Sequence, residues 1–330
     1  SVAALPSPRP NSLADPSDLF PPRRNTSLGW DLANSAVLRE IDRQRLPFHT
    51  QQWHVAPLVA GTYEGAGERT LVNPARPDDA VGTVREASAE DVHSAIGNAK
   101  RWDDVGVAQR AFVLRSAADL YENDAGELLG LLAREAGKGL PDAIAEIREA
   151  VDFLRYYAGR AEEMGDNTAR GVFACISPWN FPLAIFTGQI AAALAAGNAV
   201  VAKPAEATPL IAHAAVRLLH AAGVPRETLQ LLPGDGPSVG SVLAGDARIG
   251  GVCFTGSTAT AQRINQAMAE NLSPAAPLIA ETGGLNAGIV DSTALPEQAV
   301  RDAIASSFQS AGQRCSALRV LYLQDDVADV

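Results

Sequence analysis

Short β-rich runs alternate with helical segments from Gly171 onward, and this pattern constrains the fold more than any other feature. The β-rich runs are VFACI at 172–176, NAVVAK at 198–203, TLQLL at 228–232, GGVCF at 250–254 and PLIAE at 277–281. Helical segments lie between them, for example at 183–196 and 208–222. Alternating β and α elements predict an α/β fold, in which helices pack on the faces of a parallel sheet.

The ends of these helical segments carry matching signals. Gly197 and Gly223 follow the segments at the position where glycine commonly ends a helix. Thr208 and Pro209 stand where a capping threonine and a first-turn proline are favoured. Local chemistry therefore agrees with the alternating pattern.

The residues before Gly171 are less regular. Proline is frequent in residues 1–25, which predicts an extended linker, and a partly helical stretch is expected near 32–44. Turn residues between β-rich runs at 62–84 predict strands or a hairpin. Apolar residues recur at helical spacing between 88 and 164, which predicts several amphipathic helices.

Length and composition exclude several classes of protein. The 330 residues are enough for about two domains. The net charge of −11 and the scattered basic residues argue against a nucleic-acid partner. The longest apolar stretch, near 190–201, is too short to span a bilayer, and the N-terminus lacks the apolar core of a signal peptide. We expect a cytoplasmic protein and, because the sequence starts at Ser1 and ends at Val330 in an acidic stretch, a piece of a longer chain.

Cys315 is the candidate nucleophile among the three cysteines. Cys175 and Cys253 lie inside apolar β-rich runs and are expected to be buried and inert, and the spacings predict neither a disulfide framework nor a metal site. Cys315 follows a helical run at 296–311 and stands beside Arg314, which favours an exposed thiolate. A Cys-His protease remains an alternative at this point, since spacing in the sequence does not exclude it.

Polar residues follow the predicted strands, where open α/β sheets place their ligand crevice. Glu281 is a candidate general base, and Asn180 is either an oxyanion donor or a turn residue. Lys203 and Glu206 suit ribose hydroxyls, or form a surface ion pair. Glycines in LLPGDGPSVG and the FTGS turn are candidates for phosphate binding, although GxGxxxG differs from the dinucleotide fingerprint GxGxxG.

Six motifs taken together resemble the aldehyde dehydrogenase superfamily: ISPWNFP, AKPAE, PGDGPSVG, FTGST, ETGGLN and GQRCSA, in this order. The 34-residue interval between Glu281 and Cys315 is also similar to that family's spacing of base and nucleophile. Within the superfamily, FPLAIFTGQIAAALAAGNAVVAKPAE and REAVDFLRYYAG resemble the glutamate semialdehyde dehydrogenase module of the proline utilization A family. The resemblance runs from about Asp18 to the last residue.

This resemblance implies a Rossmann-type NAD-binding domain at 60–290, preceded by a Pro-rich linker and N-terminal segment at 1–59. The start of a second α/β catalytic domain would occupy 291–330. The resemblance further implies NAD-dependent oxidation of L-glutamate γ-semialdehyde to L-glutamate through a cysteine thioester. The semialdehyde would come from 1-pyrroline-5-carboxylate, and the reaction would belong to proline catabolism. A proline dehydrogenase domain in the parent chain and a homo-oligomeric parent are expected as well.

The resemblance also implies individual roles. Cys315 would attack the aldehyde, Asn180 and the Cys315 N–H would hold the oxyanion, and Glu281 would activate water. Lys203 and Glu206 would hold the adenosine ribose, with Glu206 disfavouring a 2′-phosphate. Expected cofactor contacts are Ile176, Ser177, Pro178, Trp179, Lys203, Glu206, Gly236, Gly240, Phe254, Thr255, Gly256, Ser257, Thr282 and Gly283. Expected substrate contacts are Phe181, Ser316, and Arg314 paired with Glu135.

The sequence departs from the family pattern in two places. A short Pro-Leu-Gly segment that usually precedes VFACISPWN is absent. The sequence also ends soon after Cys315, so a later glutamate, most of the catalytic domain and the substrate anchor loop are missing. Two alternatives therefore stay open: another NAD(P)-dependent aldehyde dehydrogenase, or an inactive dinucleotide-binding scaffold.

Overall fold

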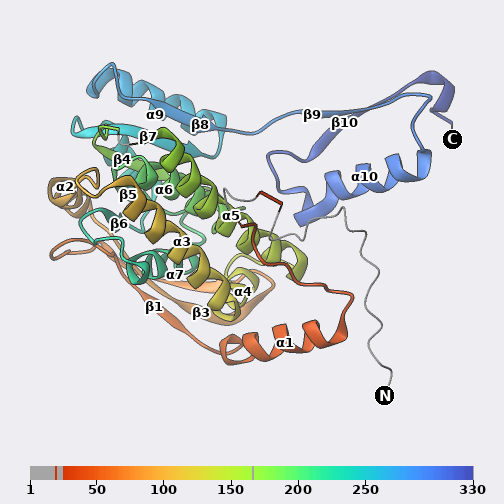
Figure 1. Ribbon diagram of the computed structural model, residues 1–330, viewed down its shortest axis with the longest axis horizontal. Helices are drawn as coiled ribbons and strands as arrows, with labels where there is room; N and C mark the ends of the chain where they lie inside the picture. Colours follow the sequence, from red (N-terminus) through yellow and green to blue (C-terminus); the bar gives the residue numbers. More distant parts are fainter. Residues whose placement is uncertain (1–18, 21–24, 166, 330) are drawn as a thin grey trace.

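The computed structural model describes residues 19–20, 25–165 and 167–329 (Figure 1). Most of the expected Pro-rich linker at 1–25 lies outside the described residues. The described part of the N-terminal segment packs on the rest of the chain: the buried Ser27 donates from its backbone N–H to Asp152 Oδ1 at 2.8 Å. It also contains helix α1 (Ser35–Arg45), which confirms the helix expected near 32–44, and the 3₁₀ turn η2 (Leu46–Phe48).

A five-stranded parallel sheet forms the centre of the fold, with strand order β6-β5-β4-β7-β8. Each predicted β-rich run overlaps one of its strands, so the predicted α/β class is confirmed. The strands are β4 (Val172–Ile176), β5 (Ala199–Lys203), β6 (Leu229–Leu231), β7 (Ile249–Thr255) and β8 (Leu278–Glu281).

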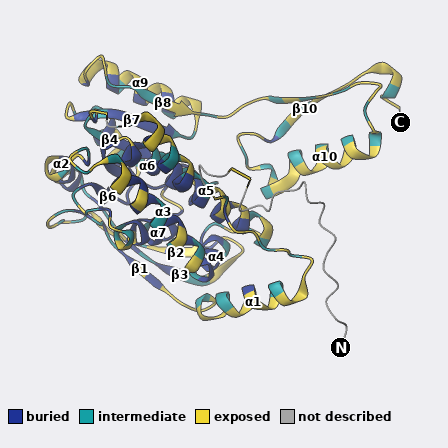
Figure 2. Cartoon of the chain, viewed as in Figure 1, coloured by how far each residue is buried: buried dark blue, intermediate teal, exposed yellow. Residues whose placement is uncertain are grey.

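The sheet separates two hydrophobic cores. Alternate strand residues face opposite sides, so Cys175 and Ala202 join one core while Ala174 and Val201 join the other. Both faces are covered, which is why these strands read as nearly continuous apolar runs. Figure 2 shows the buried residues concentrated in and around this sheet.

Helices cover both faces of the sheet, as the sequence predicts. The larger core holds α3 (Val107–Asn123), α4 (Ala125–Arg134), α5 (Leu140–Met164), α6 (Ala184–Ala195) and α7 (Pro209–Ala222). The smaller core is formed by residues of α2 (Ala89–Asn98), the short π-helix η3 (Gly236–Gly240), α8 (Ser241–Gly245) and α9 (Thr258–Asn271). Gly197 (φ 82°) and Gly223 (φ 116°) end α6 and α7 in the left-handed region, as expected.

A three-stranded sheet lies beside the central one, with strand order β1-β3-β2. β2 (Gly67–Asn73) and β3 (Arg76–Glu86) form an antiparallel hairpin, which confirms the prediction for 62–84. β1 (Trp53–Val55) runs parallel to β3. An antiparallel bridge between Leu58 and Leu231 connects the N-terminal segment to the edge strand β6.

The last described residues form a separate β-α-β arm that extends away from the central sheet (Figure 1). β9 (Asn286–Val290) pairs in parallel with β10 (Leu318–Leu323), and α10 (Pro296–Phe308), η4 (Gln309–Gly312) and η5 (Asp325–Val327) complete the arm. β9 thus belongs to the arm's sheet, so the change of sheet occurs between Glu281 and Asn286, a few residues before the expected domain boundary at 290. The division into two domains stays a prediction.

The N-terminus of α7 is capped differently from the expectation. Thr208 occupies the capping position with Pro209 after it, but the Thr208 side chain makes no capping bond. Instead Glu135, from the end of α4, accepts hydrogen bonds from the backbone N–H groups of Leu210 (2.7 Å) and Ile211 (2.9 Å). Glu135, which is distant in the sequence, therefore caps α7 in place of Thr208.

No helix within 25–165 or 167–329 is long and apolar enough to cross a membrane.

We predict that Glu135 makes stability depend on pH. Burial raises the pKa of Glu135 from 4.5 to about 8, against the opposing effect of its two backbone N–H donors. The folded protein therefore binds this proton more tightly than the unfolded chain. The contribution of Glu135 protonation to the free energy of unfolding is complete below about pH 4.5 and is lost as the pH rises through about 8.

Urea unfolding of the protein and its Glu135→Gln variant at several values from pH 5 to 8.5 measures this effect. The unfolding free energy of the unaltered protein minus that of Glu135→Gln should fall by more than about 1 kcal/mol as the pH rises across this range. Glu90→Gln, which changes an exposed carboxylate in the first turn of α2, is the control and should show a flat difference. A flat difference for Glu135→Gln would contradict the assignment.

Candidate active site

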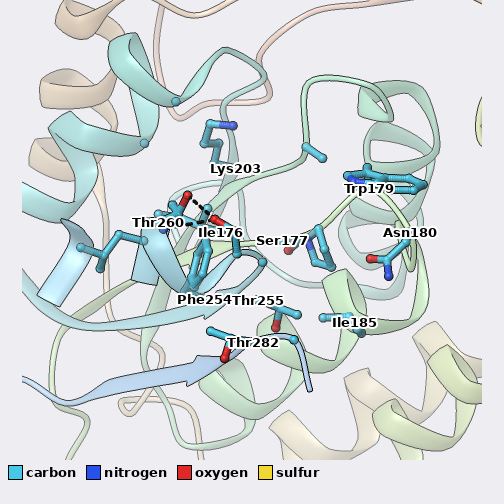
Figure 3. Close-up of a pocket in the computed structure, with 18 of the residues that line it drawn as sticks. Ile176, Ser177, Trp179, Asn180, Ile185, Lys203, Phe254, Thr255, Thr260 and Thr282 are labelled. Carbon is cyan, nitrogen blue, oxygen red and sulfur yellow. Dashed lines mark hydrogen bonds between the residues drawn. The ribbon is translucent and has the colours of Figure 1, made fainter. Parts of the chain in front are cut away.

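A cavity of about 780 Å³ lies at the carboxyl ends of β4, β5, β7 and β8. Because parallel strands end at the same edge, loops far apart in the sequence meet there. Figure 3 shows Lys203, Trp179 and Thr282 approaching the cavity from three of these strand ends. All of the expected cofactor contacts line it: Ile176, Ser177, Pro178, Trp179, Lys203, Glu206, Gly236, Gly240, Phe254, Thr255, Gly256, Ser257, Thr282 and Gly283.

Lys203 and Glu206 form an ion pair at the end of β5, with Lys203 Nζ 3.1 Å from Glu206 Oε1. The Lys203 side chain is 4% exposed and the Glu206 side chain 49%. Burial lowers the pKa of Lys203, and the charge of Glu206 opposes that shift. Arg69 of the β2–β3 hairpin donates to the Glu206 carbonyl at 2.7 Å, so the hairpin holds this loop in place.

Residues at the N-terminus of α9 and in the short helix η3 line the cavity. Ser257 caps α9, and its Oγ accepts from the Thr260 N–H at 3.1 Å. Asp235 caps η3, and its Oδ1 accepts from the Ser238 N–H at 2.6 Å. Gly240, in η3, leaves room beside the Lys203 chain, since a Cβ there would lie 3.5 Å from Lys203 Cδ. Such helix N-termini suit phosphate groups.

Gln189 is a residue of this site that sequence reasoning missed. From α6 it accepts from Ser177 Oγ at 3.0 Å and donates to Thr255 Oγ1 at 3.0 Å. It therefore connects the carboxyl ends of β4 and β7 beneath the cavity. A single glutamine within an apolar helix was the only signal in the sequence.

Cys315 lies between the large cavity and a second cavity of about 290 Å³, and it lines both. Its side chain is exposed, whereas Cys175 and Cys253 are buried, as predicted. The expected substrate contacts Phe181, Arg314 and Ser316 line the smaller cavity. Lys138, Asp142 and Glu149 also line it, although the sequence did not single them out for this role. Burial and the charge of Glu146 raise the pKa of Glu149.

The loop before Cys315 has an unusual backbone. Ser310 (φ 55°) and Ala311 (φ 54°) are left-handed, and Gly312 (φ 69°) follows them. The backbone leaves the helical region at Gln309 (ψ 139°), so α10 ends at Phe308 and not at the expected Ala311. The left-handed conformations that follow are costly for residues with a side chain. Two side chains donate hydrogen bonds to the backbone carbonyls that follow. Arg319 donates to Gly312 O at 2.7 Å, and Asn180 Nδ2 donates to Gln313 O at 2.8 Å.

Glu281 ends β8, and its carbonyl accepts from the Gly256 N–H at 3.1 Å. Its side chain is exposed and lines neither cavity, while the next two residues, Thr282 and Gly283, line the large one. The strand thus brings Glu281 to the rim of the site.

The expected pair of Arg314 and Glu135 is not formed. Glu135 caps α7 and lines neither cavity, because both of its oxygens accept backbone N–H groups there. Arg314 instead donates to the carbonyls of Ala305 (3.3 Å) and Ser306 (3.0 Å) near the end of α10. The expectation for Glu135 was therefore wrong.

A buried ion pair supports the turn that carries Asn180. Lys138 Nζ lies 2.7 Å from Glu146 Oε1, and both side chains are at most 5% exposed. Glu146 Oε2 accepts from the N–H groups of Ala184 (2.8 Å) and Leu183 (3.3 Å) at the start of α6. Lys138 Nζ also lies 4.6 Å from the centre of the Phe181 ring. Burial raises the pKa of Glu146, and Lys138 opposes that shift.

Comparison with known proteins gives a consistent set of relatives. The sequence model described as "Aldehyde dehydrogenase family" matches residues 63–330. The "Bifunctional protein PutA" of Klebsiella aerogenes is 52% identical over 337 residues, covering 99% of this chain and 26% of that protein. The "1-pyrroline-5-carboxylate dehydrogenase" of Geobacillus kaustophilus is 35% identical, covering 83% of this chain and 58% of that protein.

Solved structures agree. Proline utilization A (PutA) of Bdellovibrio bacteriovorus aligns with a TM-score of 0.88 at 31% identity, over 93% of this chain and 35% of that one. A 1-pyrroline-5-carboxylate dehydrogenase from Thermus, with bound NAD, aligns with a TM-score of 0.86 at 29% identity, over 91% and 63%. The chain thus spans about a quarter of the PutA relatives and 58% of the 1-pyrroline-5-carboxylate dehydrogenases of similar sequence.

We predict that Lys138 and Glu146 are strongly coupled in stability. Lys138→Met leaves a buried carboxylate without its cation, which should cost about 3–5 kcal/mol of unfolding free energy. Adding Glu146→Gln to that variant should recover part of the loss, and denaturant unfolding of the single and double variants measures it. Arg43→Met, which breaks the exposed pair with Glu40, is the control and should leave the midpoint unchanged. Additive effects of the two buried changes would refute the coupling.

Proposed function

The chain belongs to the aldehyde dehydrogenase family, and on that premise we propose that the protein containing it oxidises L-glutamate γ-semialdehyde to L-glutamate with NAD⁺. One observation supports this proposal above all others. The exposed thiol of Cys315 lies between a large cavity, which contains every expected cofactor contact, and a smaller cavity. A nucleophile placed between a cofactor cavity and a substrate cavity suits oxidation through a covalent intermediate.

The residues of the large cavity fit a dinucleotide. The capped N-terminus of α9 at Ser257 suits the pyrophosphate. Lys203 and Glu206 suit ribose hydroxyls, and the Glu206 carboxylate repels a 2′-phosphate, which favours NAD⁺ over NADP⁺. When bound, NAD⁺ supplies the acceptor for the hydride that leaves the substrate carbon.

The thiolate of Cys315 would attack the aldehyde carbon to form a hemithioacetal. The resulting oxyanion would accept hydrogen bonds from the Asn180 amide and the Cys315 backbone N–H. Only one of the two Asn180 amide hydrogens is needed for Gln313 O, so the other is free for the oxyanion. Loss of hydride leaves a thioester on Cys315.

Water would then hydrolyse the thioester and release the carboxylic acid. Glu281 is the proposed base, because it stands at the rim of the large cavity beside Thr282 and Gly283. A side-chain rotation at the end of β8 would be required, since the Glu281 carboxylate lines neither cavity. The proton removed from water passes to Glu281, and Cys315 leaves as the thiolate.

The smaller cavity supports an aldehyde that also carries a carboxylate and an ammonium group. Ser316 offers a hydroxyl to the carboxylate, and the ring of Phe181 offers an apolar surface to the aliphatic chain. Asp142 supplies negative charge for the ammonium group, and Glu149 supplies acceptor oxygens. Arg314 contributes by holding the end of α10, through its bonds to Ala305 and Ser306.

The proposal extends to the whole protein. The bifunctional PutA relatives support a longer parent chain in which a proline dehydrogenase domain accompanies this module. We also propose a cytoplasmic, homo-oligomeric parent.

An absorbance assay for NADH tests the proposed reaction, using the full natural polypeptide and L-glutamate γ-semialdehyde with NAD⁺ or NADP⁺. We expect NAD⁺ to be strongly preferred. Cys315→Ala should abolish oxidation, because no thioester can form, while leaving NAD⁺ affinity within about twofold. Normal turnover by Cys315→Ala would refute the nucleophile assignment, and activity with other aldehydes alone would refute the substrate.

Glu281→Gln separates oxidation from hydrolysis. Because its amide cannot accept a proton from water, this variant should release a first burst of NADH and then turn over at least about a hundredfold more slowly. Stopped-flow absorbance at 340 nm measures both phases. Glu270→Gln, an exposed change on α9, is the control and should behave as the unaltered enzyme. Equal loss of the burst and the steady rate would instead indicate a role before hydride transfer.

A further inference from the structure

Asn286, the first residue of β9, holds the backbone on the C-terminal side of the nucleophile. Its Nδ2 donates to the carbonyl of Cys315 at 2.6 Å and to the carbonyl of Ala317 at 3.0 Å. The residue is also the register partner of Leu318 at the start of β10. Asn286 therefore connects the two strands of the arm at the point where the Cys315 loop enters the second strand.

The orientation of this amide follows from its partners. Both are carbonyl oxygens, so only the NH₂ group can face them, and its two hydrogens are matched by two acceptors. Gly284 makes the arrangement possible: a Cβ there would lie 2.8 Å from Asn286 Oδ1 and 3.4 Å from the Cys315 carbonyl. A side chain at position 284 would displace the amide.

We propose that Asn286 is a positioning residue for Cys315, an inference that rests on the proposed function. The loop needs such support because it contains the left-handed Ser310 and Ala311, and because Cys315 is exposed and lacks a packed surround. Hydrogen bonds to carbonyls of the loop from Arg319, Asn180 and Asn286 thus fix the path of the backbone. Of these, one bond from Asn286 reaches the backbone of the nucleophile itself.

Fixing the Cys315 carbonyl fixes the direction of the thiol and of the Cys315 N–H relative to Asn180. Nucleophilic attack and oxyanion binding need both groups in place at once, and a displacement of about 1 Å can cost a hundredfold in rate. NAD⁺ binding does not involve Asn286, which lines neither cavity. Loss of the Asn286 amide should therefore lower kcat without changing cofactor affinity.

The test compares Asn286→Ala and Asn286→Asp with Gly284→Ala in the full natural polypeptide. N286D keeps the shape but replaces the donors with oxygens that repel the two carbonyls. Asn98→Asp is the matched control, because Asn98 also donates its amide to a carbonyl, that of Ala60, far from the loop. Two measurements are made: NADH formation from the semialdehyde with the NAD⁺ dissociation constant, and hydrogen exchange of peptides covering 312–318 and 172–203.

We expect N286A, N286D and G284A each to lower kcat roughly 10- to 100-fold, with the NAD⁺ dissociation constant changed less than about twofold. Exchange should quicken in 312–318 and stay unchanged in 172–203, and N98D should match the unaltered enzyme in both measurements. Unchanged kcat, or equally faster exchange in both segments, would overturn the positioning role. If the unaltered enzyme does not oxidise the semialdehyde, the proposed function fails, and hydrogen exchange alone tests the positioning role of Asn286. Faster exchange confined to 312–318 in the Asn286 variants then supports that role, and unchanged exchange overturns it.

Discussion

Parallel pairing of β4 between β5 and β7 is the constraint on which the rest of the structure depends. Because the strands run in one direction, the segments after Ile176, Lys203 and Thr255 all emerge at the same edge. That edge becomes a cavity, since each segment turns away into a helix or an extended loop. The apolar residues that bury both faces of the sheet thus decide where polar residues can meet a ligand.

Buried carboxylates connect the helical layer to this edge. Glu135 binds the first N–H groups of α7, and Glu146 binds those of α6, the helix that directly follows the Asn180 turn. Their environments differ, because Glu146 has Lys138 beside it whereas Glu135 has no cation in hydrogen-bond contact among the described residues. The same kind of contact therefore lies beside a buried cation at Glu146, and at Glu135 it involves a group whose pKa is raised to about 8.

The nucleophile depends on a different kind of support. Cys315 lies in a loop with left-handed residues and little packing, so hydrogen bonds from Asn180, Arg319 and Asn286 replace a hydrophobic surround. These donors come from the turn after β4, from β10 and from the start of β9. Strain and exposure at the reactive residue are thus balanced by rigid elements around it.

The sequence by itself determined the five strands, their parallel direction and the residues at their carboxyl ends. Hydrophobic periodicity and turn chemistry are local properties, so a single sequence records them. The expected cofactor contacts came from the motifs' resemblance to the aldehyde dehydrogenase superfamily, and they line one cavity. Only the tertiary structure decided the partners of Glu135, Gln189 and Asn286. Glu135 binds a helix 75 residues away, and Asn286 binds a carbonyl 29 residues away. Which buried donor meets which acceptor depends on how the elements pack, and no local pattern records that choice.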